Sequence, residues 1–364
     1  MNRYKLLTPG PLTTTNTVRN VMNEDRCTWD DEYKEITQTI RKQLLQVAGV
    51  SEEKYTAVLM QGSGSFVVES VLTTAVRSSD KVLFITNGAY GERMVQMATT
   101  IGLSHTQYET PYGEAVKAAD IAEILQQDPA ITHVAMVHCE TTTGILNPIE
   151  EVIAVVKQQN KQVIIDAMSS FGGVPIDVDA LQIDYLVSSA NKCIQGVPGF
   201  GFVIANTERL AACKGVARSV SLDLYDQWQA MKVDGKWRFT SPTHVVAAFA
   251  QALVELEEEG GVAARYKRYA ASNSYLRKEM QAMGFEPYID EAHQSPIITS
   301  YFYPNEGFEF TAFYEAMKQK GFVLYPGKLT DADTFRIGNI GDIHLADMEP
   351  LVVAIKEYMG VEVS

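Results

Sequence analysis

The sequence has few cysteines, and their spacing argues against both a disulfide framework and a structural zinc site. Four occur among 364 residues, at Cys27, Cys139, Cys193 and Cys213, and none forms a CxxC pair. A disulfide-stapled secreted domain or a structural zinc site would need cysteines at closer spacing. The six histidines show no HExxH or other ligand spacing, so we expect no metal site.

Long apolar runs and an excess of positive charge are also missing. No run is long enough to span a membrane, and the opening MNRYKLLTPGP lacks the apolar segment of a signal peptide, so we expect a cytoplasmic protein. The 31 Lys and Arg against 45 Asp and Glu give a net charge of −14, which argues against nucleic acid and membrane partners. A small anionic ligand is compatible with this charge, because a few local arginines and N–H groups can bind it.

What the sequence does contain is an alternation of apolar strands with helical stretches. The predicted strands are KVLFITNG, THVAMVHCE, QVIIDAMSS, DYLVSSANK and GFGFVIAN, and residues 149–160 form the clearest intervening helix. Strands that alternate with helices are typical of a parallel sheet flanked by helices. We therefore predict an α/β fold whose large domain has a mostly parallel sheet.

The pattern changes near Gly260, which suggests a division of the chain. Residues 1–15, with Pro9, Gly10 and Pro11, predict an extended N-terminal arm. Residues 16–260 are expected to form the large domain, and residues 261–364 a smaller C-terminal α+β domain. Within the large domain, the polar and charged stretch 228–237 predicts a surface loop.

Polar residues follow several predicted strands. Asp166 ends the run VIID, and Lys192 follows LVSSAN. Ligands of open α/β sheets bind at the carboxyl ends of strands, so an acid and an amine there suggest one ligand held at two points. Upstream, residues 62–65 (GSGS) lie between a strand and a helix, where free N–H groups favour a phosphate. A Ser/Gly helix cap without a ligand explains GSGS equally well.

With Tyr90 after another strand and Arg336 in a late one, the polar residues suit pyridoxal 5′-phosphate. This cofactor requires an anion site, a ring stacker, a carboxylate for its pyridine nitrogen and an amine for covalent attachment. The order of these residues resembles that of the fold-type I enzymes, specifically the class V aminotransferases. The segments LLTPGP, QGSGS, ETTTG, SSANK and FRIG match the landmarks of that family along essentially the whole chain.

The resemblance implies a role for each residue. Lys192 and Asp166 would be catalytic: Lys192 would bond to the cofactor and move the substrate proton, and Asp166 would pair with the pyridine nitrogen. Arg336 would bind the anionic end of the substrate. Weaker candidates for that contact are Arg19, Arg26 and Arg93. The other implied cofactor contacts are Ser63, Gly64, Ser65, Tyr90 (stacked on the ring), Thr142, Asn191 and, from the second subunit of a homodimer with shared active sites, Thr240.

Most of these residues also have ordinary structural explanations. Asp166 or Thr240 could cap a helix, Tyr90 could be a core aromatic, Lys192 could lie on the surface, and Arg336 could form a surface ion pair. The resemblance favours the functional role in each case.

Two long runs narrow the expected substrate. DAMSSFGGVPIDVDALQIDYLVSSANKCIQGVPGFGFVI and WRFTSPTHVVAAFAQAL are very similar to members of the family that act on an aminophosphonate. The resemblance implies that the amine of 2-aminoethylphosphonate passes to pyruvate in phosphonate catabolism. The two half-reactions would be linked by pyridoxamine phosphate in a ping-pong scheme, and the products would be phosphonoacetaldehyde and L-alanine.

Several rival hypotheses remain. An alanine–glyoxylate or serine–pyruvate transaminase would carry the same cofactor residues. A cysteine desulfurase would need a late cysteine, whereas the last one is Cys213. A Rossmann dinucleotide binder would need the third glycine of GxGxxG, which GSGSFV lacks. A non-catalytic scaffold would have no reason to keep both Lys192 and Asp166.

Overall fold

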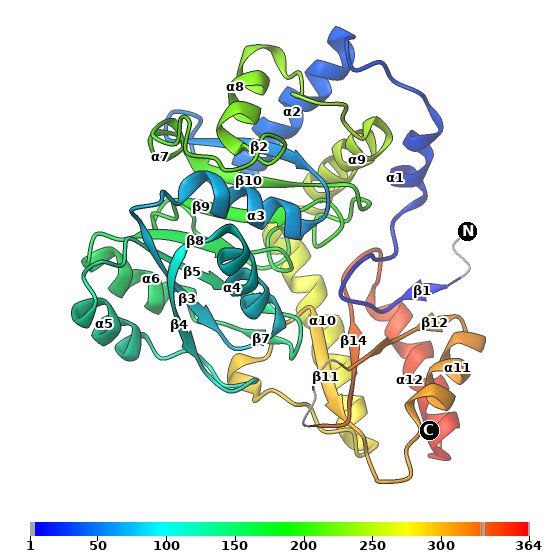
Figure 1. Ribbon diagram of the computed structural model, residues 1–364. Helices are drawn as coiled ribbons and strands as arrows, with labels where there is room; N and C mark the ends of the chain where they lie inside the picture. Colours follow the sequence, from blue (N-terminus) through cyan, green and yellow to red (C-terminus); the bar gives the residue numbers. More distant parts are fainter. Residues whose placement is uncertain (1–3, 328, 330–331, 363–364) are drawn as a thin grey trace.

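The computed structural model describes residues 4–327, 329 and 332–362, and within them one seven-stranded sheet forms the centre of the molecule (Figure 1). In spatial order its strands are β2 Tyr55–Gln61, β10 Phe200–Asn206, β9 Tyr185–Ser189, β8 Gln162–Asp166, β5 His133–Val137, β3 Lys81–Thr86 and β4 Ser104–Glu109. Strand β10 pairs antiparallel with both neighbours, and the other pairings are parallel. Strand β2 therefore points the same way as the parallel strands, and six carboxyl ends meet at one edge.

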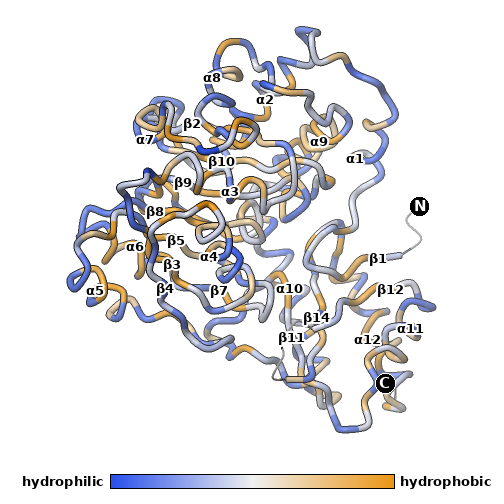
Figure 2. The backbone as a smooth tube through the Cα atoms, viewed as in Figure 1, coloured by the Kyte–Doolittle hydropathy of each residue, from blue (hydrophilic) through white to orange (hydrophobic). Residues whose placement is uncertain are grey.

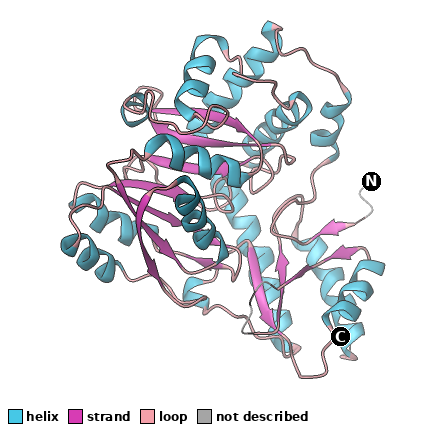
Figure 3. Ribbon diagram, viewed as in Figure 1, coloured by secondary structure: helices cyan, strands magenta, loops and turns pink. Residues whose placement is uncertain are grey.

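Helices cover both faces of this sheet (Figure 3). Helices α3 and α4 contact each other and pack against β9, β10, β3 and β4, whereas α5 and α6 form a second contacting pair. Right-handed crossovers place these two pairs on opposite faces. The helices of the described chain are α1 Asn16–Asn20, α2 Asp31–Val47, α3 Gly64–Ala75, α4 Ala89–Ile101, α5 Ala118–Gln127, α6 Ile149–Gln158, α7 Thr207–Ala211, α8 Leu224–Asp234, α9 Thr243–Glu259, α10 Gly261–Ala282, α11 Phe310–Gln319 and α12 Leu345–Met359, with the 3-10 turns η1 Val21–Asn23 and η2 Glu291–His293.

Most strands of the sheet are buried because they are apolar on both faces; the edge strand β4 is polar and partly exposed. All five residues of β5 and of β9 are buried, as are six of the seven in β10. Strands covered by helices on both sides need such continuous apolar runs rather than an alternating pattern. In Figure 2 the inner strands are largely hydrophobic in colour, whereas the flanking helices show both hydrophobic and hydrophilic segments.

A smaller sheet lies in the C-terminal part of the chain. Its antiparallel strands, in spatial order, are β11 Ile298–Phe302, β14 Thr334–Gly338 and β13 Tyr325–Pro326. Helix α10 contacts both α9 and α12, and so connects the two parts of the molecule. The N-terminal strand β1 Lys5–Leu6 pairs in parallel with β12 Phe322–Val323, and Leu7 is fully buried in the C-terminal hydrophobic cluster. A short hairpin, β6 Cys139–Glu140 with β7 Ile145–Leu146, follows β5.

The structure confirms the predicted α/β class and corrects one local prediction. Residues 228–237 were expected to form a surface loop, but most of them belong to helix α8, which ends at the left-handed Gly235. Trp228 and Trp237 are each only 5% exposed and join the main hydrophobic core. The polar residues between them lie on the outer side of this element, so composition alone was misleading.

Candidate active site

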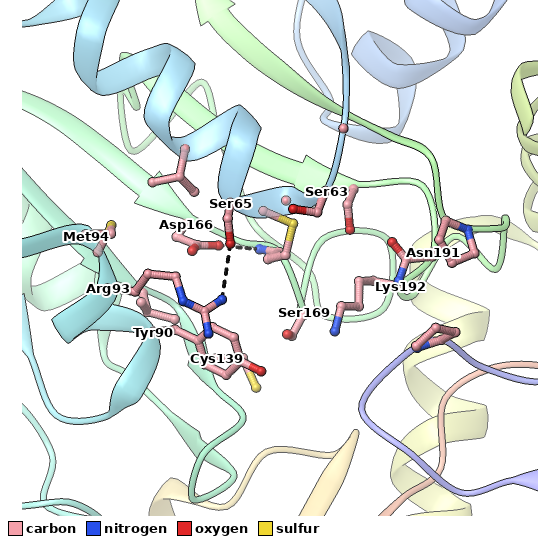
Figure 4. Close-up of a pocket in the computed structure, with 18 of the residues that line it drawn as sticks. Ser63, Ser65, Tyr90, Arg93, Met94, Cys139, Asp166, Ser169, Asn191 and Lys192 are labelled. Carbon is pink, nitrogen blue, oxygen red and sulfur yellow. Dashed lines mark hydrogen bonds between the residues drawn. The ribbon is translucent and has the colours of Figure 1, made fainter. Parts of the chain in front are cut away.

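A cavity of about 510 Å³ opens at the carboxyl-end edge of the central sheet (Figure 4). Its wall includes the turn between β2 and α3, the start of α4, the end of β8 and the loop after β9. The predicted residues Ser63, Gly64, Ser65, Tyr90, Asp166, Asn191 and Lys192 all line it. Residues scattered over 130 positions of sequence thus converge because parallel strands end at a common edge.

Lys192 lies in the turn after β9 and is held by the N-terminal arm. Its Nζ donates a hydrogen bond to the Pro9 carbonyl oxygen at 2.5 Å. Burial of the charged form lowers the pKa of Lys192 to about 8. A substantial fraction of this amine is therefore neutral near physiological pH, as a nucleophile or proton acceptor must be.

Asp166 is the last residue of β8, and the residue is only 6% exposed. The Met168 N–H donates to Asp166 Oδ1 at 2.9 Å. Burial raises the pKa of Asp166 to about 6, although Lys192 and Arg93 attract its charge from a distance. A buried carboxylate with so little compensation suits a cationic ligand atom in the cavity.

The N-terminus of α3 supplies the anion-binding part of the wall. Gly62 turns the chain at φ +118°, and Ser63 then caps the helix without using its side chain in a capping hydrogen bond. The first N–H groups of a helix have no partners within that helix, and its dipole favours negative charge there. Residues 62–65 can therefore hold a phosphate, as the sequence predicts.

Tyr90 and Arg93 lie one helical turn apart on α4 and face the same side of the cavity. The Arg93 guanidinium lies 4.9 Å from the centre of the Tyr90 ring, and its Nη1 donates to Ser65 Oγ at 3.1 Å. Figure 4 shows Arg93 between Tyr90 and Ser65, across the cavity from Lys192. Of the three weaker arginine candidates, Arg93 alone lines this cavity within the described chain. Arg19 and Arg26 bond instead to residues near them in sequence.

Thr142 is buried next to this cavity rather than in its wall. Its Oγ1 donates to Glu140 Oε1 at 2.6 Å and accepts a hydrogen bond from Ala89 N at 3.1 Å. Sequence reasoning gave no role to Glu140, although it opens the family motif ETTTG. It is fully buried at the end of β6 and accepts bonds from the backbone at the start of α4.

Arg336 comes from β14 of the smaller sheet and is 3% exposed. Its Nη1 donates to the Thr141 carbonyl at 2.8 Å, and its Nε donates to the Pro326 carbonyl at 3.0 Å. This excludes the alternative of a surface ion pair. Burial lowers the pKa of Arg336, but a guanidinium stays charged because its ordinary pKa lies far above neutral pH.

Thr240 is exposed and lies outside the cavity of its own chain. It borders a separate pocket formed with Thr28 and residues 236–239. The structure therefore does not bring Thr240 together with the other predicted cofactor residues of the same chain. The expectation that it serves a neighbouring subunit stays a prediction.

The cavity residues fit pyridoxal 5′-phosphate. The site combines an anion-binding helix terminus, an aromatic ring at Tyr90, an amine with a lowered pKa at Lys192 and the poorly compensated carboxylate of Asp166. These groups match the phosphate, ring, aldehyde and pyridine nitrogen of that cofactor. Among the described residues, no cluster of His, Cys, Asp and Glu could hold a metal ion, and no helix is long and apolar enough to cross a bilayer.

Comparison with known sequences gives close relatives over the full chain. The family described as aminotransferase class-V matches residues 15–324. The chain is 65% identical over 362 residues to a 2-aminoethylphosphonate–pyruvate transaminase of Lysinibacillus sphaericus (strain C3-41), covering 100% of this chain and 99% of the relative. It is 59% identical to the protein of the same name from Bacillus cytotoxicus, covering 98% of both chains.

Solved structures with low identity share the fold. Ureidoglycine–glyoxylate aminotransferase from Bacillus subtilis superimposes with a TM-score of 0.91 at 20% identity, over 100% of this chain and 95% of that one. Pyridoxamine–pyruvate aminotransferase from Mesorhizobium loti gives 0.89 at 23% identity, over 99% and 93%. At such identities the likeness concerns the fold, which is that of fold-type I aminotransferases.

Proposed function

Because the chain belongs to the class-V aminotransferase family, we propose that it transfers the amino group of 2-aminoethylphosphonate to pyruvate, with phosphonoacetaldehyde and L-alanine as products. The observation that carries this proposal is the 65% identity, end to end, with a transaminase named for these two substrates. The donor's amine-bearing carbon becomes an aldehyde, and the carbonyl carbon of pyruvate gains the amine. The exchange is redox-neutral and needs no external oxidant. Its setting would be phosphonate catabolism.

The cofactor of this family is pyridoxal 5′-phosphate. When bound, it carries the amino group between the two substrates and withdraws electrons from the carbon that loses a proton. We infer that Ser63, Gly64, Ser65 and Asn191 hold its phosphate end, while Tyr90 covers the ring and Thr142 approaches the ring oxygen. The Asp166 carboxylate would hold a proton on the pyridine nitrogen, which its burial and its lack of an ion-pair partner among the described residues support.

Lys192 would be the covalent anchor and the proton carrier. Its Nζ would take the proton from the amine-bearing carbon of the substrate and would then deliver it to a carbon of the cofactor. The lowered pKa of about 8 leaves the amine able both to accept and to release a proton near neutrality. The hydrogen bond to the Pro9 carbonyl orients this amine toward the cavity.

Arg336 would bind the phosphonate of the donor and then the carboxylate of pyruvate. Within the described chain two carbonyls fix its Nε and Nη1, and Nη2 has no such bond, so its hydrogens are available for anionic oxygens. Guanidinium matches both anions with two parallel hydrogen bonds, which lysine cannot do. Arg93, unlike Arg336, lines the cavity wall and adds a positive charge there.

The organisation that we propose extends beyond one site. The first 15 residues would act as an arm, residues 16–260 as the cofactor domain and residues 261–364 as the small domain, in a homodimer with shared sites. The exposed Phe66 beside Ser65, and the exposed Phe239 beside Thr240, support a subunit contact near the site. All four cysteines are free thiols, which supports a reducing cytoplasmic location.

A panel of amino donors tests the substrate assignment. The protein is loaded with cofactor and mixed separately with 2-aminoethylphosphonate, β-alanine and L-serine, while the cofactor absorption is recorded. We expect a fast change with 2-aminoethylphosphonate, and L-alanine formation once pyruvate is added. β-Alanine is the matched control, because it replaces the phosphonate by a carboxylate on the same two-carbon amine. L-Alanine itself does not discriminate, since it is a donor under both hypotheses.

The Lys192→Ala variant provides the negative control, and we expect no donor to alter its cofactor absorption at a comparable rate. A response to L-serine without one to 2-aminoethylphosphonate would replace our assignment by a serine–pyruvate activity. No contact among the described cavity residues favours that rival.

A further inference from the structure

Glu140 is a carboxylate buried beside the cavity without a cation among the described residues that contact it. It ends the short strand β6 and has no measurable exposure. Isolated buried charges are costly unless hydrogen bonds replace the lost water. Here backbone N–H groups and one hydroxyl supply these bonds, and burial still raises the pKa of Glu140 above its ordinary value. Such an arrangement calls for a functional explanation.

One oxygen of Glu140 holds the start of α4. Oε2 accepts hydrogen bonds from Tyr90 N at 3.1 Å and from Gly91 N at 3.2 Å. These are first-turn N–H groups, which lack partners within their own helix and favour a negative charge. Gly88 makes the approach possible, because a Cβ there would collide with the side chain of Glu140. The backbone that carries the Tyr90 ring is thus fixed by a carboxylate 50 residues away in sequence.

The other oxygen holds Thr142. Oε1 accepts from Thr142 N at 3.2 Å and from Thr142 Oγ1 at 2.6 Å. The same hydroxyl accepts from Ala89 N at 3.1 Å, which closes a ring of hydrogen bonds back to α4. Each carboxylate oxygen therefore has two donors, and each set of donors includes a predicted cofactor contact, Tyr90 at Oε2 and Thr142 at Oε1.

The loop that begins at Glu140 also reaches the substrate anion site. The carbonyl oxygen of the next residue, Thr141, accepts a hydrogen bond from Arg336 Nη1 at 2.8 Å. Arg336 belongs to the smaller sheet, so this bond connects the two parts of the molecule at the site. This bond is one of two that hold the guanidinium, and the Pro326 carbonyl accepts the other.

We propose that Glu140 is the positioning residue of this enzyme, which sets Tyr90 and Thr142 against the cofactor and, through Thr141, Arg336 against the substrate anion. The claim about Arg336 rests on the proposed function, because it concerns the substrate anion. The claim about Tyr90 and Thr142 concerns the cofactor and requires no assumption about the amino donor. A carboxylate that merely stabilised the fold would leave cofactor affinity and the donor's KM unchanged.

The main test compares Glu140→Gln with Asp184→Asn. Asp184 is the matched control: it is 4% exposed, accepts a bond from Val163 N at 2.7 Å and pairs with Lys157, at the opposite, amino-terminal edge of the sheet. The glutamine introduced by Glu140→Gln would retain one acceptor oxygen but turn an NH₂ group toward N–H or O–H donors. Cofactor is titrated into each cofactor-free protein and binding is followed by fluorescence, alongside the thermal midpoint.

We expect Glu140→Gln to weaken cofactor binding by about tenfold or more, as for loss of a charge-assisted hydrogen bond. The KM for the aminophosphonate donor should rise as well, and kcat should fall by a smaller factor. Asp184→Asn should lower the thermal midpoint with cofactor affinity and KM unchanged. Wild-type cofactor affinity in a folded Glu140→Gln protein would overturn the proposal, as would equal effects in both variants.

Two further variants keep the test decisive. If Glu140→Gln does not fold, Thr142→Val preserves the shape and removes the hydroxyl that Glu140 orients. Cofactor affinity unchanged in Thr142→Val would then overturn the proposal. Where both fold, the double variant should lose much less than the product of the single losses, because Glu140 acts partly through Thr142. The two proposals can fail separately. If 2-aminoethylphosphonate is not a donor but Glu140→Gln still weakens cofactor binding, only the substrate assignment is refuted.

Discussion

Asp166 and Lys192 illustrate how burial prepares individual residues for function at a cost in stability. Burial raises the pKa of the acid to about 6 and lowers that of the amine to about 8. The charged form of each group therefore has a higher free energy in the folded protein than it would have in water. A bound cofactor would relieve both effects by pairing with the carboxylate and bonding to the amine.

Replacement of Asp166 should therefore stabilise the cofactor-free protein. The folded carboxyl holds its proton up to about pH 6, against an ordinary value of 3.8, so the folded state loses stability as the pH rises between these values. At pH 8, Asp166→Asn should gain up to about 3 kcal/mol at ~1.4 kcal/mol per pKa unit. The gain should shrink at pH 5.

Urea unfolding of the cofactor-free proteins at pH 5 and pH 8 measures this difference. Asp184→Asn should change stability in the opposite direction, because it breaks an ion pair with Lys157. A less stable Asp166→Asn protein at pH 8 would contradict the burial argument. Cofactor affinity should fall in the same variant.

Among individual residues, the sequence predicted those whose position depends only on where a single strand ends. Asp166 and Lys192 were placed at strand ends because a polar residue there interrupts a buried apolar run. Glu140 could not be found in this way, since its partners at Tyr90 and Gly91 lie far away in sequence. Arg93 had a detectable signal, being one helical turn after Tyr90, but its contact with Ser65 depends on the packing of α3 against α4.

Among the structural elements, the N-terminal arm has the closest relation to chemistry. It is anchored at one end by β1 against β12, and its Pro9 carbonyl accepts the hydrogen bond from Lys192. Gly10 has φ +112°, and a Cβ there would lie 3.0 Å from Lys192 Nζ and 3.1 Å from the Asn191 carbonyl oxygen. A side chain at this position would be strained and would displace the amine.

Gly10→Ala should thus impair function more than stability. The strained backbone should cost about 1–3 kcal/mol, and the displaced Lys192 should load with cofactor at least about tenfold more slowly. Gly49→Ala is the control, because Gly49 has φ +66° and an added Cβ there would meet nothing within 4 Å. Stopped-flow absorbance after cofactor addition measures loading, and thermal melts measure stability. Equal loading rates in the two variants would show that the arm does not orient Lys192.

Element boundaries were predicted well where the hydrophobic period is clear, and poorly where tertiary contacts decide. The helix expected over 149–160 is α6, Ile149–Gln158. Helix α8 was missed because its buried side depends on contacts such as that of Gln227 Nε2 with the Leu59 carbonyl. The antiparallel direction of β10 likewise comes from its pairing, which no local pattern encodes.

For the whole molecule, sequence patterns indicated the α/β fold class and the alternation of strands with helices, but not how chains assemble. The expected boundary near residue 260 coincides with the turn between α9 and α10, at Gly260 with φ +104°. The division into domains nevertheless stays a prediction, because α10 contacts both α9 and α12. The number of subunits is decided by contacts between chains, which the folding pattern of one chain does not encode.

The proposed homodimer leads to a testable prediction about which chain supplies Thr240 to each site. Thr240 lies outside the cavity of its own chain, and the neighbouring Phe239 is 52% exposed. If Thr240 serves the partner's site, a hybrid of one Lys192→Ala subunit and one Thr240→Ala subunit contains one intact site. Random mixing yields about half hybrids, so about a quarter of wild-type activity should return at limiting cofactor concentration. Neither variant alone should reach this level.

The control for this mixing experiment is a hybrid of Lys192→Ala with Asp166→Asn. Both changes affect residues that each chain contributes to its own cavity, so neither site of that hybrid is intact and no activity should return. Sedimentation of the wild-type protein should give a dimer. A fully active monomer, or equal activity in the two kinds of hybrid, would place the Thr240 contact outside the shared site. A gain confined to the Thr240 hybrid would mean that each cavity takes its last phosphate contact from the other chain.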